Sequence, residues 1–211
     1  MIVTAPIQNN IFNTLASDAQ IERTMKSLEA NNIHAILAEN GAEARQMLLE
    51  ILPAHAEVFI SSSTTLNTLG ITEEIDKSDH YDSVRAKMGM MNSKTQNREM
   101  QKMGATPEYI LGSIHALTET GSAIIASATG SQLAGYASGA AHVIWVVGTQ
   151  KIVPTFEDGL KRVAEYTLPL EDARALKEYG VHSSINKLLI VYKESKPGRT
   201  TVILVKENLG F

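Results

Sequence analysis

Short apolar runs recur along the chain and are separated by polar or amphipathic segments. Five runs have the length of buried strands: residues 34–38, 57–60, 109–114, 123–127 and 142–148. Between the first two, an Ala- and Leu-rich segment predicts a helix at 42–52 that Pro53 ends. Strand, helix and strand in this order are typical of a βαβ unit with a parallel sheet.

Helical spacing of apolar residues predicts further helices. Asp18 can cap a helix that the asparagines at 31 and 32 end. Other helices are predicted at 66–69, 133–141, 156–166 and 171–179, the last ended by Gly180. The polar segment 71–105 is predicted to hold helices and loops, with its methionines at packing or subunit contacts.

The C-terminal segment contains two β-branched runs on either side of Lys196-Pro197-Gly198-Arg199, which predicts a β-hairpin. The predicted fold class is α/β, with a largely parallel sheet flanked by helices and this hairpin attached. No repeat or linker is visible, so we expect a polar N-terminal arm at 1–17 and one domain at 18–211.

Composition and charge exclude several function classes. The 211 residues carry a formal net charge of −4 without a dense Lys/Arg cluster, so we expect no nucleic-acid binding. The chain contains no cysteine, which excludes disulfides, thiolate nucleophiles and iron–sulfur ligation by thiolates. The histidine spacing predicts no metal site, and without a recognisable leader or membrane span we expect a cytoplasmic protein.

The first candidate site is a run of hydroxyl residues after the strand at 57–60. In open α/β sheets, ligands bind where the carboxyl ends of strands meet loops and helix N-termini. The run consists of Ser61, Ser62, Ser63, Thr64 and Thr65. These residues could hold a phosphate or carboxylate, or they could serve only as helix N-caps. They do not form a Walker loop, because the Gly and Lys of that motif are absent.

The second candidate is Glu119, which lies between Thr118 and Thr120 and directly before Gly121. A carboxylate held in this turn could act as a base, a nucleophile or an acceptor for a ligand hydroxyl. The alternative is an exposed turn glutamate without a chemical role, as glutamates usually are.

A third candidate follows the strand at 123–127. Thr129, Gly130, Ser131 and Gln132 open the predicted small-residue helix and could present amide groups to an anion. An ordinary turn with an N-cap explains the same residues.

Two isolated residues complete the candidates. His115 lies beside the Glu119 turn and is a candidate ligand contact. Arg199 follows Pro-Gly in the predicted hairpin and is a weaker candidate, because turn arginines are usually solvated.

The segment IHALTETGSAIIASATGSQLAGYASGAAHVIWVVGTQKIVPTFEDGLKRV at 114–163 resembles the signature of the LUD domain, the lactate-utilisation LutB/LutC-like family. The resemblance continues at 57–70 and 196–211, so residues 18–211 are identified as an LUD domain. It implies a Rossmann-like fold of the NagB/RpiA/CoA-transferase-like group. It also implies a setting, the oxidation of L-lactate to pyruvate by a three-part complex whose other members carry iron–sulfur clusters.

The resemblance also concerns the candidate residues. The hydroxyl run at 61–65 resembles the phosphate-binding loop of sugar-phosphate isomerases. The family's Thr/Ala-Glu-x-Gly turn falls on 118–121, which favours Glu119 as a catalytic residue.

Four positions depart from the pattern of short family members. His115 stands in place of Asn, Ser127 in place of Asp, and Ser131-Gln132 in place of Asn-Arg. The departures at 127 and 132 remove an acid and an anion clamp, which argues against a direct transfer of catalytic roles.

Two hypotheses follow. The first is a LutC-type accessory or ligand-binding subunit without a cluster, in L-lactate or related organic-acid utilisation, with iron–sulfur proteins as partners. The second is a stand-alone enzyme that acts on a phosphorylated or CoA-linked small molecule, with Glu119 as base or nucleophile. We expect no covalently bound cofactor; a nucleotide, CoA or phosphorylated compound is the expected ligand class, and a homo-oligomer is compatible with the small-residue and methionine-rich surfaces.

Overall fold

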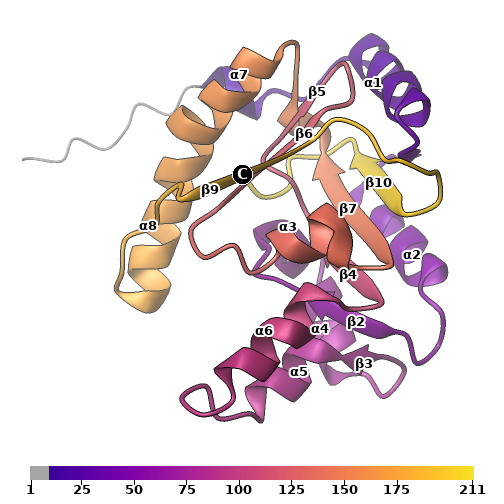
Figure 1. Cartoon of the computed structure of the whole chain (residues 1–211). Coiled ribbons are helices and arrows are strands. Elements are labelled where there is room, and N and C mark those ends of the chain that lie inside the picture. The colour runs from indigo at the N-terminus through magenta and orange to yellow at the C-terminus, as the bar shows by residue number, and fades with distance from the viewer. Residues whose placement is uncertain (1–9) are drawn as a thin grey trace, which may run out of the picture.

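The computed structural model describes residues 10–211, which form two β-sheets and the helices around them (Figure 1). All six strands of the larger sheet, sheet A, are parallel. In spatial order they are β1 (His34–Ala38), β10 (Thr200–Val205), β7 (His142–Gly148), β4 (Tyr109–Gly112), β2 (Glu57–Ile60) and β3 (Asp82–Ser83). The predicted α/β class with a largely parallel sheet is confirmed.

Strand β7 runs through the middle of sheet A and is buried on both faces. Val143, Trp145 and Val147 belong to one hydrophobic cluster, whereas Ile144 and Val146 belong to another on the opposite face. A strand with two buried faces needs apolar residues at successive positions, which explains the uninterrupted run at 142–148.

Helices cover both faces of sheet A (Figure 1). One face packs against α2 (Gly41–Ile51), α3 (Thr64–Thr68) and α4 (Ile71–Lys77). The other packs against α1 (Asp18–Ala30), α5 (Val84–Gly89) and α6 (Asn97–Ala105). The short helical elements are η1 (Asn10–Asn13) and η3 (Thr149–Lys151), both 3-10, and the π-helical η2 (Gly135–Gly139) and η4 (Arg162–Thr167). None of the helices formed by residues 10–211 is long and apolar enough to cross a membrane.

A second, mixed sheet, sheet B, lies beside the α1 face of sheet A. In spatial order its strands are β8 (Ile152–Val153), β5 (Ala116–Thr118), β6 (Ala123–Ser127) and β9 (Lys187–Val191). Leu117 and Ile125 belong to a hydrophobic cluster that also contains residues of sheet A, whereas Ile124 belongs to a cluster on the opposite face of sheet B. That opposite face is covered by one continuous helical run of α7 (Phe156–Lys161), η4 and α8 (Leu168–Tyr179), seen in orange in Figure 1.

Two neighbouring strands of sheet A continue directly into two neighbouring strands of sheet B. Residues 113–115 join β4 to β5, and η3 joins β7 to β8. Both strand pairs are parallel, β4 with β7 and β5 with β8. The two connections therefore run side by side where the sheets diverge, at the carboxyl end of sheet A.

The predicted C-terminal hairpin does not form. Both strands exist, but β9 pairs with β6 in sheet B, and β10 pairs with β1 and β7 in sheet A. The reason lies in their burial, because β10 is apolar on both faces and suits the middle of a parallel sheet. By contrast, β9 is half exposed and forms an edge.

Several predicted element boundaries also change. Ser17, not Asp18, caps α1, and Gln20 completes its capping box. The predicted helices at 156–166 and 171–179 are parts of one run, α7 to α8. The predicted strand at 109–114 ends at Gly112 because the chain bends there toward β5. The first nine residues of the predicted N-terminal arm lie outside the described residues.

Gly112 at the end of β4 is a position that only glycine can fill. A Cβ there would lie 1.8 Å from the hydroxyl oxygen of Tyr136, whose side chain is buried against Trp145 and cannot swing away. We expect Gly112→Ala to lower the free energy of unfolding by about 1–3 kcal/mol, the usual effect of overpacking a core, as measured by urea denaturation.

Gly89→Ala is the matched control, because a Cβ at Gly89 meets no atom within 4 Å and the residue lies in helix α5. It should leave the urea midpoint unchanged or raise it slightly. Equal midpoints for both variants would contradict the packing described around Tyr136.

Candidate functional site

A cavity of about 340 Å³ opens at the carboxyl end of sheet A, where sheets A and B diverge. Its inner wall comes from the loop after β2, from the connection after β4 and from η3 after β7. The outer wall comes from α8, the segment 181–185 and Phe211. This is the edge at which ligands bind in open α/β sheets.

Lys151 is the central residue of the inner wall. It is the last residue of η3, its side chain is 1% exposed, and it still lines the cavity. Its Nζ donates hydrogen bonds to Oγ1 of Thr65 at 3.2 Å and to Oγ of Ser113 at 3.0 Å. Among residues 10–211 no carboxylate lies within the 4.0 Å of an ion pair with Lys151. Burial and the nearby Arg162 lower the pKa of Lys151 well below its ordinary value.

Arg162, the first residue of η4, is a second buried cation and has a structural role. Its guanidinium donates to the carbonyl of His115, to the hydroxyl of Thr167 at 3.1 Å and to the carbonyl of Phe12 at 3.4 Å. It also lies 5.1 Å from the ring centroid of Tyr166. Burial lowers its pKa to about 10, so it keeps its charge at neutral pH. This charge makes a second positive charge on Lys151 less favourable.

His115 lies in the cavity wall in its neutral form. Its Nδ1 accepts a hydrogen bond from the backbone N–H of Ala126 at 3.1 Å, which assigns the ring proton to Nε2. Desolvation, with Lys151 and Arg162 nearby, lowers the pKa of His115 to about 3. His115, a predicted ligand contact, therefore lines the cavity as a neutral imidazole.

All five hydroxyl residues at 61–65 line the cavity. Ser63 caps α3 through a hydrogen bond from the N–H of Leu66 at 3.3 Å, as the capping interpretation requires. Thr65 is buried, accepts from Lys151 and donates to the carbonyl of Leu209 at 3.2 Å. The loop thus combines a capping residue with hydroxyls that face the cavity.

Three of the four residues at 129–132 also line the cavity, namely Thr129, Ser131 and Gln132, while Gly130 provides the turn at φ +87°. Ser127, which lines the cavity as well, donates to Oε1 of Gln132 at 3.1 Å. The two departures from the family pattern are therefore bonded to each other, and this part of the wall is polar and uncharged.

Glu119 does not line the cavity. Its carboxylate accepts from Nε and Nη2 of Arg23, each at 2.8 Å, and from Nε2 of Gln20 at 3.0 Å, both on α1. The Arg23 hydrogen bond is the main cause that lowers the pKa of Glu119. The geometry therefore gives Glu119 a role in fastening the turn to α1, and the predicted catalytic role gains no support from it.

The other residues of that turn serve the same fastening. The hydroxyls of Thr118 and Thr120 lie 2.8 Å apart, and Thr118 accepts from the N–H of Ser122 at 2.9 Å. Gly121 has φ +83°, and a Cβ there would collide with α1. None of these three candidates lines the cavity.

Arg199 also lies outside the cavity lining. It donates to the carbonyls of Gly135, Tyr136 and Ala140 at 2.7, 3.0 and 3.1 Å and pairs with Glu194 at 2.7 Å. These bonds satisfy carbonyl groups at the end of η2, which is a structural role.

Charged side chains on the outer wall are already paired. Arg174 binds both carboxylate oxygens of Glu171 at 2.7 Å and also pairs with Glu178. His182 lies 3.0 Å from the carboxylate of Asp172, which keeps the pKa of Asp172 below its ordinary value. No group of three or more His, Asp or Glu side chains among residues 10–211 is arranged to hold a metal ion.

Sequence reasoning missed the two residues at the centre of the cavity, Lys151 and Ser113. Lys151 follows the carboxyl end of the correctly predicted strand at 142–148, so the rule that led to the loop at 61–65 would have found it. Ser113 lay inside the predicted strand at 109–114, and it follows a strand end only because β4 stops at Gly112.

The chain belongs to the LUD domain family, since the model of that family matches residues 21–205. The family is associated with lactate utilisation. Among solved structures, the chain is similar to a DUF162 (LUD domain) family protein from Deinococcus radiodurans, with a TM-score of 0.57 and 14% identity over 91% of this chain and 99% of that chain. At this identity the likeness shows the fold alone. No curated protein matches the chain.

We expect Lys151→Met to raise the free energy of unfolding at pH 7 by about 1–4 kcal/mol, the range found when buried ion pairs are replaced by packed apolar residues, because Met removes the cost of burying the ionisable amine. The folded-state pKa of Lys151 lies below the unfolded value, so the unfolded chain binds more protons between the two pKa values. The penalty on folding is therefore largest at or below the folded pKa and vanishes as pH rises toward the unfolded value.

Urea denaturation of both proteins at pH 7 and pH 10 measures this difference. Lys177→Met, at an exposed position, is the control and should change stability by less than about 0.5 kcal/mol. A Lys151→Met variant that is equally destabilised at both pH values would contradict the claim that Lys151 is buried without a charge partner.

Glu119→Gln tests the fastening role. Arg23 is 56% exposed and Glu119 19%, so loss of the ion pair should lower the free energy of unfolding by less than about 1 kcal/mol. Since the folded pKa of Glu119 is lowered, the difference should be present at neutral pH and disappear in acid. Ligand binding in the cavity should be unchanged, and a loss of binding without loss of stability would restore Glu119 to the site.

Proposed function

We propose that this LUD-domain protein is a LutC-type, cluster-free accessory or ligand-binding subunit in the utilisation of L-lactate or a related organic acid, and that it binds a small organic anion. Family membership supports the metabolic setting. The absence of cysteine supports the cluster-free role, since iron–sulfur clusters are held by thiolates. An iron–sulfur protein is accordingly the proposed partner.

The observation that carries the ligand class is the Lys151 amine, which is buried at the cavity and has no carboxylate partner within the described residues 10–211. Its partners are neutral hydroxyls, and the wall around it is built of further hydroxyl and amide groups. Glu171 is the carboxylate of the outer wall, and Arg174 neutralises it. Such a cavity favours a carboxylate or phosphate over a cation.

The volume favours a small ligand. About 340 Å³ is at the lower end of the range for ligand pockets, so a metabolite of a few carbons fits better than a whole nucleotide. A nucleotide or CoA compound would have to leave part of itself outside the cavity.

The second candidate function is an enzyme that acts alone on a phosphorylated or CoA-linked compound. A buried amine of lowered pKa next to a serine hydroxyl is the observation that favours it. On this hypothesis Lys151 replaces Glu119 as the reactive group, because Glu119 lies outside the cavity.

A thermal-shift screen tests the ligand class with L-lactate, pyruvate, inorganic phosphate, ATP with magnesium, and CoA. A compound at a hundred times its dissociation constant should stabilise the fold by about 2.7 kcal/mol, which raises Tm by several degrees. We expect an organic acid to do so, and we expect Lys151→Met and Thr65→Val to lose the shift while Glu119→Gln keeps it.

A shift that survives in both cavity variants would contradict this location of the site. Turnover of a phosphorylated or CoA-linked compound by the purified chain alone would contradict the accessory role and support the enzyme.

A further inference from the structure

The hydrogen bonds of Lys151 match an uncharged amine. Its Nζ donates to two hydroxyl oxygens, and each hydroxyl uses its own proton elsewhere, Thr65 on the carbonyl of Leu209 and Ser113 on the carbonyl of Ile114. In this arrangement Nζ is the donor in both of its hydrogen bonds. A neutral amine has two N–H groups and one lone pair, so these two bonds use its N–H groups and leave the lone pair unengaged.

The surroundings also disfavour an ammonium ion. An ammonium ion has three N–H groups, and no acceptor among residues 10–211 lies within hydrogen-bond distance of the third. The ionisable groups near Lys151 are the buried guanidinium of Arg162 and the neutral imidazole of His115. On the outer wall, Glu171 is engaged by Arg174. A desolvated lysine beside another cation is the arrangement that turns a lysine into a nucleophile.

The cavity gives a ligand access to this amine. Lys151, Ser113 and Thr65 all line it, together with Ser61, Ser62 and Ser63 on one side. A small acid could place its carboxylate among these hydroxyls and its neighbouring carbon at Nζ.

We propose that the Lys151 amine forms an imine with the carbonyl group of a small 2-oxo acid bound in this cavity, an inference that rests on the proposed function. The lone pair of Nζ attacks the carbonyl carbon, a C–N bond forms, and a proton moves from nitrogen to oxygen to give a carbinolamine. Loss of water then forms the C=N bond and carries away the carbonyl oxygen and both amine protons. The step needs no oxidant or reductant. Ser113, 3.0 Å from Nζ, is placed to accept the proton from nitrogen and to release its own, which the carbonyl of Ile114 now holds, to the oxygen.

Reductive trapping tests the imine. The full chain is incubated with pyruvate and cyanoborohydride near neutral pH, digested and mapped by mass spectrometry. We expect the peptide with Lys151 to gain the mass of pyruvic acid less one oxygen atom, before the exposed lysines react. L-Lactate, which has no carbonyl group, should give no adduct.

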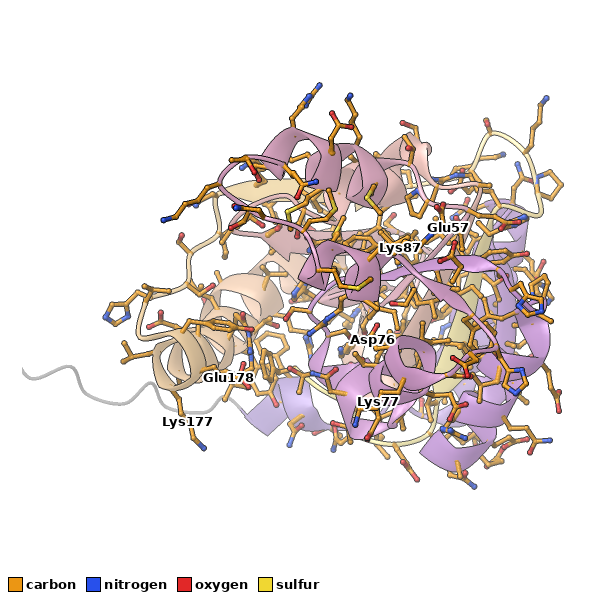
Figure 2. The ribbon with its side chains drawn as sticks, turned by 90° about the horizontal axis from the view of Figure 1, so that it is seen from below. Glu57, Asp76, Lys77, Lys87, Lys177 and Glu178 are labelled. Atoms are coloured by element: carbon orange, nitrogen blue, oxygen red, sulfur yellow. The ribbon has the colours of Figure 1, made fainter. Side chains whose placement is uncertain are left out.

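Lys177 projects from the surface of α8 in Figure 2, so in the wild-type chain its peptide reports nonspecific alkylation. Lys177→Arg is the matched control variant and should leave the adduct at Lys151 unchanged. Lys151→Met should abolish the specific adduct, and Ser113→Ala should slow its formation at unchanged Tm. If Lys151→Met does not fold, the ratio of adduct on the peptides of Lys151 and Lys177 in the wild-type chain decides the question.

The outcomes separate the two proposals. Adducts confined to exposed lysines, with a pyruvate-dependent rise in Tm retained, would overturn the imine and leave organic-acid binding in place. Neither an adduct at Lys151 nor a rise in Tm with any organic acid would overturn both.

Discussion

The site depends on one constraint, the continuation of two adjacent parallel strands from one sheet into the next. Strands β4 and β7 are both buried in sheet A and enter sheet B as β5 and β8 after short connections. Strands β4 and β7 are parallel neighbours in sheet A, and β5 and β8 are parallel neighbours in sheet B. Ser113 and Lys151, in the two connections, therefore meet where the sheets diverge. The divergence leaves the space that the α7–α8 run and residue 211 then enclose. The cavity is thus a consequence of the sheet topology.

Keeping an amine in that position opposes folding, and the fold compensates elsewhere. The apolar residues of β7 and β10 are buried on both faces of sheet A, and their burial contributes hydrophobic stabilisation. Lys151 and Arg162 place two basic side chains in the interior, and neither has a carboxylate partner among residues 10–211. Buried groups of this kind reduce stability and cluster at binding and reactive sites, which agrees with the position of Lys151 in the cavity wall.

The sequence was most informative where structure is local. The strands at 34–38, 57–60, 123–127 and 142–148 have the predicted bounds, because an apolar run between polar turns depends on neighbouring residues. The hairpin was wrong because strand pairing is decided by distant partners, and β10 finds two of them in sheet A. Glu119 lies in the predicted turn, but its partner Arg23 comes from α1, far away in sequence. In the sequence, Lys151 looks like an ordinary loop lysine. Its burial becomes apparent only when the segments after β4 and β7 lie side by side in the structure.

An uncharged Lys151 amine underlies the proposed imine, and the pKa of this amine can be measured directly. Proton titration of the chain with isotope-labelled lysine side chains, followed by NMR, resolves each Nζ environment, and Lys151→Met assigns the signal in question. We predict one lysine that titrates well below 10.5 and disappears in the variant. If every lysine titrated near 10.5, Lys151 would be a charged ammonium ion with no free lone pair, which would contradict the uncharged amine and remove the basis of the imine.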